Sequence, residues 1–167
     1  MLKEWWSVEM ILYHGSNCDI DKVDLLKCKP YKDFGQSFYL TTLVSQAKEM
    51  AQKVAERFDG NPIVNVFEFD EGLQSSLNVK NFESANREWA EFVMANRSRN
   101  VDHPANMFDL IIGPVANDDI ATLFRTFSNG IISIEDLVNG LSYRKLNNQY
   151  AFRTLRALSL LRKTGTL

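Results

Sequence analysis

The most informative segment of the chain reads Phe34-Gly35-Gln36-Ser37-Phe38-Tyr39-Leu40-Thr41. Aromatic and β-branched residues favour strands, and Gly35 precedes them as a turn former, so we predict a strand at 37–41. Thr42 follows as a candidate helix N-cap, and apolar residues then recur at helical spacing from Leu43 to Phe58. This segment therefore predicts a strand that leads directly into a helix.

Outward from this segment, short strands and amphipathic helices mix along the chain. We predict further strands at 10–13, 63–69, 108–114 and 149–152. We predict further helices at 84–96, 120–127 and 134–141, and a terminal helix that Thr154 caps and that carries Leu155, Leu158 and Leu161. The order lacks a strict strand–helix–strand alternation, which favours an α+β fold over a doubly wound sheet.

Length and composition limit the class of protein. The 167 residues (19.2 kDa) suit one domain, expected at 10–167 after an N-terminal extension at 1–9. A formal net charge of −2 argues against a global basic field for nucleic acid. The sequence lacks a run of about 18 apolar residues, so we expect no membrane span and a cytoplasmic protein. Cys18 and Cys28 lack the spacing of a zinc site, and no metal is expected.

The two histidines of the chain differ in setting. His14 follows a short apolar run and precedes Gly15, where its ring can project into a cleft while the glycine lets a ligand approach the backbone. The alternative is a turn histidine with a satisfied hydrogen bond. His103, in a polar loop between Asp102 and Pro104, is expected at the surface, so His14 is the candidate for chemistry.

Other candidate residues, taken singly, have structural explanations that come before the functional ones. Tyr39 could be a half-buried packing residue, and Gly35 could serve a turn alone. Glu88 and Glu91 share one face of a predicted helix and could form a carboxylate pair, although a solvated helix face explains them as well. Gln149 opens a predicted strand, where its amide could donate to and accept from a hydroxyl-rich ligand.

Taken in order, three blocks resemble the conserved blocks of the ADP-ribosyltransferase superfamily. They are the segments 12–16 (LYHGS), 34–41 with the helix that follows, and 148–152 (NQYAF). The match is to the diphtheria-toxin-like and poly(ADP-ribose)-polymerase-like branch, whose blocks centre on His, Tyr and Glu. With 88–97 and 108–118 added, the chain resembles more closely a bacterial family catalogued as domain of unknown function 3990, from about Met10 to Leu161.

This resemblance implies a fold with two small curved sheets that form an NAD cleft flanked by helices. It implies that His14 bonds a ribose hydroxyl of NAD, that the Gly15 backbone holds the nicotinamide carboxamide, and that Tyr39 stacks on the nicotinamide ring. Ser16, Phe34, Gly35 and Gln149 complete the NAD-binding set that the resemblance implies.

Gln149 stands where the branch usually carries a catalytic glutamate. A glutamine can orient the ribose but lacks the negative charge that stabilises an oxocarbenium ion. We therefore expect a mono-ADP-ribosyltransferase with an unknown acceptor, with Glu88 or Glu91 hypothesised to supply the carboxylate. Occurrence beside small partner proteins in that family implies a bacterial toxin with an antitoxin.

Two alternatives stay open at this point. The first is a catalytically inactive module that keeps the fold and binds NAD, ADP-ribose or a protein partner. The second is a non-catalytic interaction protein whose aromatic residues, Trp5 and Trp6 among them, contact a partner.

Overall fold

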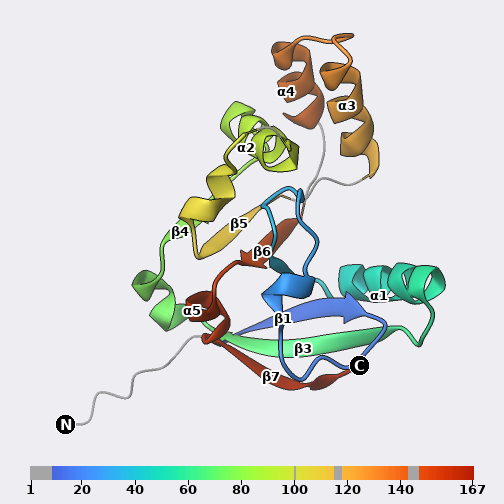
Figure 1. Ribbon diagram of the computed structural model, residues 1–167, viewed down its shortest axis with the longest axis vertical. Helices are drawn as coiled ribbons and strands as arrows, with labels where there is room; N and C mark the ends of the chain where they lie inside the picture. The colour runs from blue at the N-terminus through green and yellow to red at the C-terminus, as the bar shows by residue number, and fades with distance from the viewer. Residues whose placement is uncertain (1–8, 100, 115–117, 143–146) are drawn as a thin grey trace.

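A computed structural model describes residues 9–99, 101–114, 118–142 and 147–167 of the chain (Figure 1). The strands are β1 (Glu9–Ser16), β2 (Phe38–Thr41), β3 (Ile63–Asp70), β4 (Val79–Asn81), β5 (Leu110–Pro114), β6 (Asn148–Phe152) and β7 (Leu161–Thr166). The α-helices are α1 (Val44–Phe58), α2 (Arg87–Arg97), α3 (Asp118–Ser128), α4 (Ile134–Ser142) and α5 (Leu155–Leu158). Three short 3-10 helices are η1 (Leu25–Lys27), η2 (Glu71–Ser76) and η3 (Pro104–Met107).

All seven strands belong to one sheet, in the order β4-β5-β6-β2-β1-β3-β7. Only the β4–β5 pair is parallel among the strand pairs that the structure describes, and the others are antiparallel. A mostly antiparallel sheet with separate helices confirms the α+β class. Residues 1–8, most of the expected N-terminal extension and both Trp5 and Trp6, lie outside the described residues.

The sheet is nearly divided between β1 and β2. β1 pairs with β3 along its full eight residues, but with β2 only through Tyr13 and Thr41. Two separate sheets were expected from the resemblance, and this expectation needs correction, because the single pair joins all seven strands. We call the open part of this contact, His14–Ser16 on β1 and Phe38–Leu40 on β2, the β1–β2 junction.

Helix α1 covers one face of β1 and β3 (Figure 1). Ala47 and Ala51 of the helix are buried against Val64 and Tyr13. Gly15 makes this close approach possible, since a Cβ there would overlap the Ala47 carbonyl oxygen and lie 2.6 Å from the Ala51 nitrogen. The first role of this glycine is thus to let a helix backbone lie on the strand.

Two larger cores fill opposite faces of the sheet. On the face of Tyr39, Ile111 and Ala151, helices α2, α3 and α4 bury Trp89, Phe124 and Leu137, among others. On the other face, a second cluster is built from Leu12, Phe38, Leu40, Phe67, Phe69, Leu110, Ile112, Phe152 and Ala157. Because side chains alternate along each strand, neighbouring residues enter different cores.

Most predicted elements are confirmed. The predicted strand at 37–41 and helix from Leu43 appear as β2 and α1, and the strands at 63–69, 108–114 and 149–152 appear as β3, β5 and β6. Ser133 caps α4 as expected, since its Oγ accepts from Asp136 N and donates to the Asp136 carboxylate. Thr42 is not the cap of α1: the N-cap is Leu43, whose nitrogen donates to Thr41 Oγ1.

Two predicted boundaries are wrong because long-range pairing decides them. The first strand does not stop at Tyr13 but continues to Ser16, since Asn65, Val64 and Ile63 of β3 pair with its last three residues. The terminal helix ends at Leu158 after one turn, and Leu161 instead begins β7, which pairs with β3. A local apolar pattern cannot report either partner strand.

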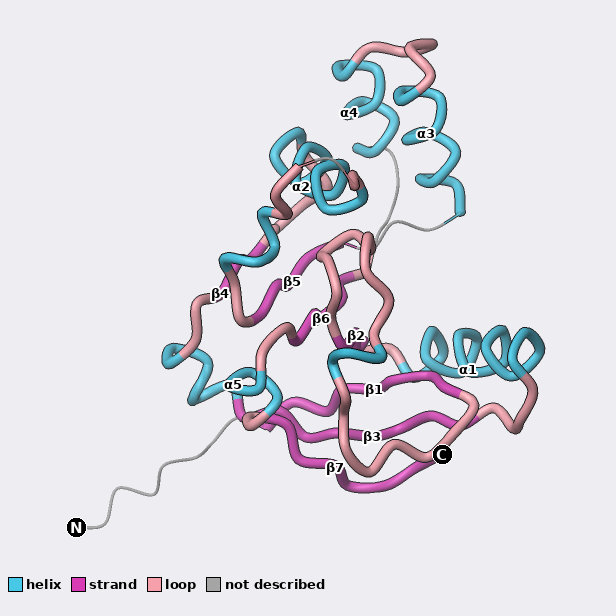
Figure 2. Tube along the Cα trace, viewed as in Figure 1, coloured by secondary structure: helices cyan, strands magenta, loops and turns pink. Residues whose placement is uncertain are grey.

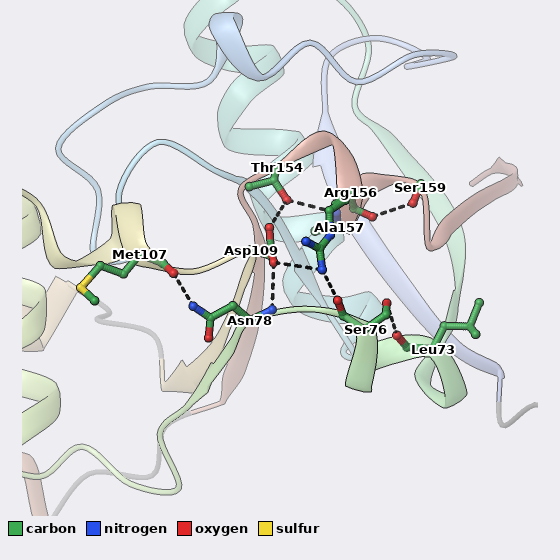
Figure 3. Close-up of polar contacts among 9 residues, drawn as sticks. All are labelled: Leu73, Ser76, Asn78, Met107, Asp109, Thr154, Arg156, Ala157 and Ser159. Atoms are coloured by element: carbon green, nitrogen blue, oxygen red, sulfur yellow. Dashed lines mark hydrogen bonds and ion pairs between the residues drawn. The ribbon is translucent and has the colours of Figure 1, made fainter.

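Asp109 ties the start of β5 to two other segments (Figure 3). Its carboxylate accepts from Asn78 N at 2.8 Å and from Thr154 Oγ1 at 2.7 Å, and Arg156 lies 4.0 Å away. The hydrogen bond from Asn78 N is the main cause that lowers the pKa of Asp109, and the hydrogen bond from Thr154 and the positive charge of Arg156 lower it further. This carboxylate joins the residue before β4, the start of β5 and the N-terminal end of α5.

None of the helices that the structure describes is long and apolar enough to cross a membrane.

Candidate functional site

At the β1–β2 junction, the backbone N–H and C=O groups of Gly15 and Tyr39 point toward the space between the two strands. Val64 exchanges both of its backbone hydrogen bonds with Leu167, so its partner Gly15 is turned away from β3 and toward β2. Every second residue of a strand turns its N–H and C=O to the same side. Thr41 turns its groups toward β1 in its pair with Tyr13, so Tyr39, two residues earlier, does the same. Gly15 and Tyr39 are not a strand pair in the described structure, and the Tyr39 carbonyl instead accepts a hydrogen bond from the His14 side chain.

The His14 side chain bridges the opening. Its Nδ1 lies 2.7 Å from the Tyr39 carbonyl oxygen, and its ring lies on Phe38, with the ring centroids 4.3 Å apart. A carbonyl only accepts, so Nδ1 carries the hydrogen and donates. Burial lowers the pKa of His14, and the hydrogen bond to Tyr39 opposes this only in part. The ring is therefore neutral near pH 7, with an unprotonated Nε2.

Nε2 of His14 is the group that can act on a ligand. It makes no hydrogen bond to the described residues. Among those residues, the fully buried side-chain atom without a hydrogen-bond partner is Arg153 Nε, so His14 Nε2 is not fully buried. It follows that Nε2 meets solvent and can accept a hydrogen bond from a hydroxyl group. Fixing one nitrogen through a backbone carbonyl sets both the tautomer and the orientation of the other.

The phenol of Tyr39 leaves the sheet on the opposite face from the His14 ring. Its ring packs against the core beneath α2–α4, and its hydroxyl donates to Gly35 O at 2.7 Å and accepts from Phe34 N at 3.1 Å. Burial raises the pKa of this hydroxyl well above its usual range, so it stays a donor. The expectation that the side chains of His14, Tyr39 and Gln149 converge in one cleft is therefore not met.

Gln149 lies one strand beyond the junction, on the face of Tyr39. It pairs with Thr41 on β2 and with Gly113 on β5, so Tyr13, Thr41 and Gln149 form a row across three strands. Its side chain is half-buried and makes no hydrogen bond to the described residues. The amide is free to contact a molecule that enters the junction from this face.

Three other predicted NAD contacts are structural in this arrangement. Phe34 is 1% exposed and packs against Phe82, so it cannot touch a ligand without a rearrangement. Gly35 has a φ of 74° and is buried, which explains the glycine by backbone conformation alone. Ser16 is buried too, with Oγ 3.6 Å from Cys18 Sγ.

Three side-chain amides that sequence reasoning missed fix the long connection between β1 and β2, drawn as the loop that carries η1 in Figure 2. Asn65 accepts from Ile20 N and donates to Cys18 O, Asn96 donates to Asp33 O, and Gln36 donates to Cys28 O. Asn65 and Asn96 are fully buried. A buried amide in an apolar pattern is the signal that could have found them.

Glu88 and Glu91 both form ion pairs. Glu88 pairs with Lys80 on β4, and Glu91 lies 2.9 Å from Arg87 one turn back on α2. Both carboxylates lie on exposed helix surface and are paired with cations, and the hypothesis that either replaces the missing glutamate stays a prediction.

Two shallow surface hollows lie elsewhere. One is lined by Asp19, Asp21 and residues 163–166 of β7, and the other by residues near Glu9 and Arg162. Neither includes His14, Tyr39 or Gln149. Among the residues that the structure describes, no group of three or more His, Cys, Asp or Glu side chains is placed to hold a metal ion.

Comparison with known proteins places this α+β chain in a family. A model described as "Protein of unknown function (DUF3990)" matches residues 10–162, and the chain belongs to that family. No curated protein and no solved structure matches it.

Proposed function

We propose that the chain binds NAD at the β1–β2 junction and transfers its ADP-ribose to an acceptor. The observation that carries the proposal is the backbone of Gly15, whose N–H and C=O point toward β2, beyond the one residue pair by which β1 and β2 are joined in the described structure. A carboxamide such as that of nicotinamide offers the complementary acceptor and donor pair. The ladder between β1 and β2 stops after one residue pair, and this is where the proposal places the ligand.

The other junction residues take roles that follow from their positions. Nε2 of His14 accepts from a ribose hydroxyl, and the carbonyl of Tyr39 holds the imidazole in the tautomer that this requires. Tyr39 is thus a positioning residue here, and its phenol fixes residues 34 and 35. Gln149 bonds the nicotinamide ribose from the other face.

The reaction breaks the bond between the anomeric carbon and the nicotinamide nitrogen. The electron pair leaves with nicotinamide, and positive charge develops on the ribose. An acceptor oxygen or nitrogen then bonds that carbon and loses its proton. Holding both sides of the breaking bond and excluding water are the contributions that such a site makes.

A second function, binding of NAD or ADP-ribose without turnover, is favoured by one observation. Gln149 is neutral, and the two carboxylates that the sequence offered in its place, Glu88 and Glu91, form ion pairs with Lys80 on β4 and Arg87 on α2. A site without a fixed negative charge lacks the usual stabilisation of an oxocarbenium ion. The bacterial toxin with an antitoxin partner stays a prediction from the family resemblance.

Labelled NAD separates these functions. The purified protein is incubated with NAD labelled in the nicotinamide and, separately, in the adenosine, with and without cell lysate. A transferase releases nicotinamide and labels a lysate fraction, and His14→Ala abolishes both signals. A binding module raises its melting temperature with NAD but releases nothing. Absence of both turnover and a thermal shift contradicts an NAD site.

A further inference from the structure

Gln46 lies in the first turn of α1, beside the residue whose carbonyl occupies the space above Gly15. α1 follows β2 after two residues, which brings this turn next to the β1–β2 junction on the face of Gln149. The side chain of Gln46 is half-buried. The role inferred below for the Gln46 amide extends the proposed NAD site and rests on that proposal.

The orientation of the Gln46 amide is set by Thr41. Thr41 Oγ1 already accepts from Leu43 N at 3.1 Å, so its own hydrogen is free to donate. It lies 2.6 Å from Gln46 Oε1, a separation usual for O–H···O and short for N–H···O. The amide oxygen therefore faces Thr41 and accepts its hydrogen, which turns the two N–H groups away from Thr41.

These two N–H groups are available to a ligand. Gln46 Nε2 makes no hydrogen bond to the described residues. It is not among their fully buried side-chain atoms that lack a partner, since that atom is Arg153 Nε. Nε2 of Gln46 therefore meets solvent. Held in this way, the amide presents its two N–H donors to solvent, which suits an acceptor oxygen of a ligand.

We propose that Gln46 is a substrate-contacting residue that donates to an acceptor oxygen of the dinucleotide, and that Thr41 is the positioning residue that makes it a donor. The nicotinamide carboxamide and the pyrophosphate both supply such oxygens. Gln46 thus selects ligands at the junction by the acceptor they present on the α1 side.

Titration calorimetry with three ligands tests this assignment. NAD, nicotinamide mononucleotide and ADP-ribose are each bound to the wild type, to Gln46→Leu and to Gln52→Leu, a matched change at an exposed position of α1. Gln46→Leu is expected to raise the Kd for NAD about tenfold, the cost of one lost hydrogen bond, while Gln52→Leu leaves it unchanged. Weakening confined to NAD and the mononucleotide identifies the carboxamide, and weakening that includes ADP-ribose identifies the phosphates.

Thr41 variants separate orientation from simple packing. Thr41→Val removes the donated hydrogen and is expected to raise the Kd for NAD several-fold, whereas Thr41→Ser keeps the hydroxyl and restores wild-type binding. Circular dichroism melting confirms that each variant is folded before binding is measured. Equal NAD binding by the wild type and Gln46→Leu overturns this assignment alone. A wild type that binds none of the three ligands overturns the proposed function with it.

Discussion

The β1–β2 junction and the β5–β6 ladder both join strands of the same sheet, but they differ in how much backbone pairing joins them. β5 and β6 pair through five residues, and the Asp109 carboxylate fastens the start of β5 to neighbouring segments. β1 and β2 share one pair, and a side chain, His14, takes over where the ladder ends. Completely paired strands have no backbone groups to offer, which is why we propose the incomplete joint as the ligand site.

Gly15→Ala tests the packing of α1 on β1, next to the open joint. The added Cβ overlaps the Ala47 carbonyl, so α1 must move off β1, and we expect a loss of about 3 kcal/mol or more in the free energy of unfolding. Urea denaturation measures it. Gly165→Ala, with no atom within 4 Å of the added Cβ, is the control and should change stability by less than about 0.5 kcal/mol. Equal effects would refute close packing at Gly15.

Asp109→Asn weakens the paired joint and spares the open one. Loss of the charge-assisted hydrogen bonds from Asn78 and Thr154 should cost about 2 kcal/mol near pH 7. Because the folded pKa of Asp109 is lowered, its contribution is present above the unfolded pKa and is lost as pH falls through the folded one. The difference between wild type and Asp109→Asn in denaturant titrations should therefore shrink below about pH 4. Asp102→Asn, at an exposed position, serves as control.

Gln149→Glu restores a negative charge at the row that crosses the open joint. We expect nicotinamide release to rise about tenfold, since a carboxylate stabilises the developing ribose cation. Gln52→Glu adds the same charge on the exposed face of α1 and should leave the rate unchanged. A rate that does not respond to Gln149→Glu, in protein that still binds NAD, would favour the inactive binding module.

The pH dependence of stability reports on His14. Burial lowers its folded pKa, so its contribution is complete above the unfolded pKa of about 6.5 and is lost as pH falls toward the folded pKa. One group limits this slope to about 1.4 kcal/mol per pH unit. Unfolding free energies measured from pH 8 to pH 5 should fall in the wild type and stay flatter in His14→Gln. Parallel curves would show that the imidazole is not buried as described.

Glu88→Gln and Glu91→Gln should have the smallest effect of all. Both carboxylates lie on the exposed surface of α2, where a single ion pair contributes little. NAD binding and nicotinamide release should stay within about twofold of the wild type. A larger loss in either variant would place α2 at the site after all.

Sequence reasoning recovered the elements that local signals define. The helical spacing of α1 and the Ser133 and Asp136 pair at α4 are visible in the chain itself. β4 is three residues long and forms against β5, and β7 exists because β3 offers an edge. Neither strand carries a pattern of its own, so only tertiary pairing could reveal them.

The candidate site divides along the same line. His14 and Gly15 were predicted from their dipeptide, but the direction of the Gly15 backbone depends on how Val64 bonds Leu167, far away in the sequence. The phenol of Tyr39 was expected on the nicotinamide and instead anchors the preceding loop. Strand alternation predicts that the Tyr39 side chain faces opposite to those of Phe38 and Leu40. It does not predict which of these side chains lie on the same face of the sheet as His14.

The central claim is most directly tested by the ring nitrogens of His14, followed by NMR with 15N-labelled histidine during an NAD titration. The chain has two histidines, so His103 is an internal reference in every spectrum. The account predicts that His14 is neutral with the hydrogen on Nδ1, and that NAD shifts its Nε2 signal while the signals of His103 stay in place. A His14 hydrogen on Nε2, or spectra unchanged at saturating NAD, would contradict it.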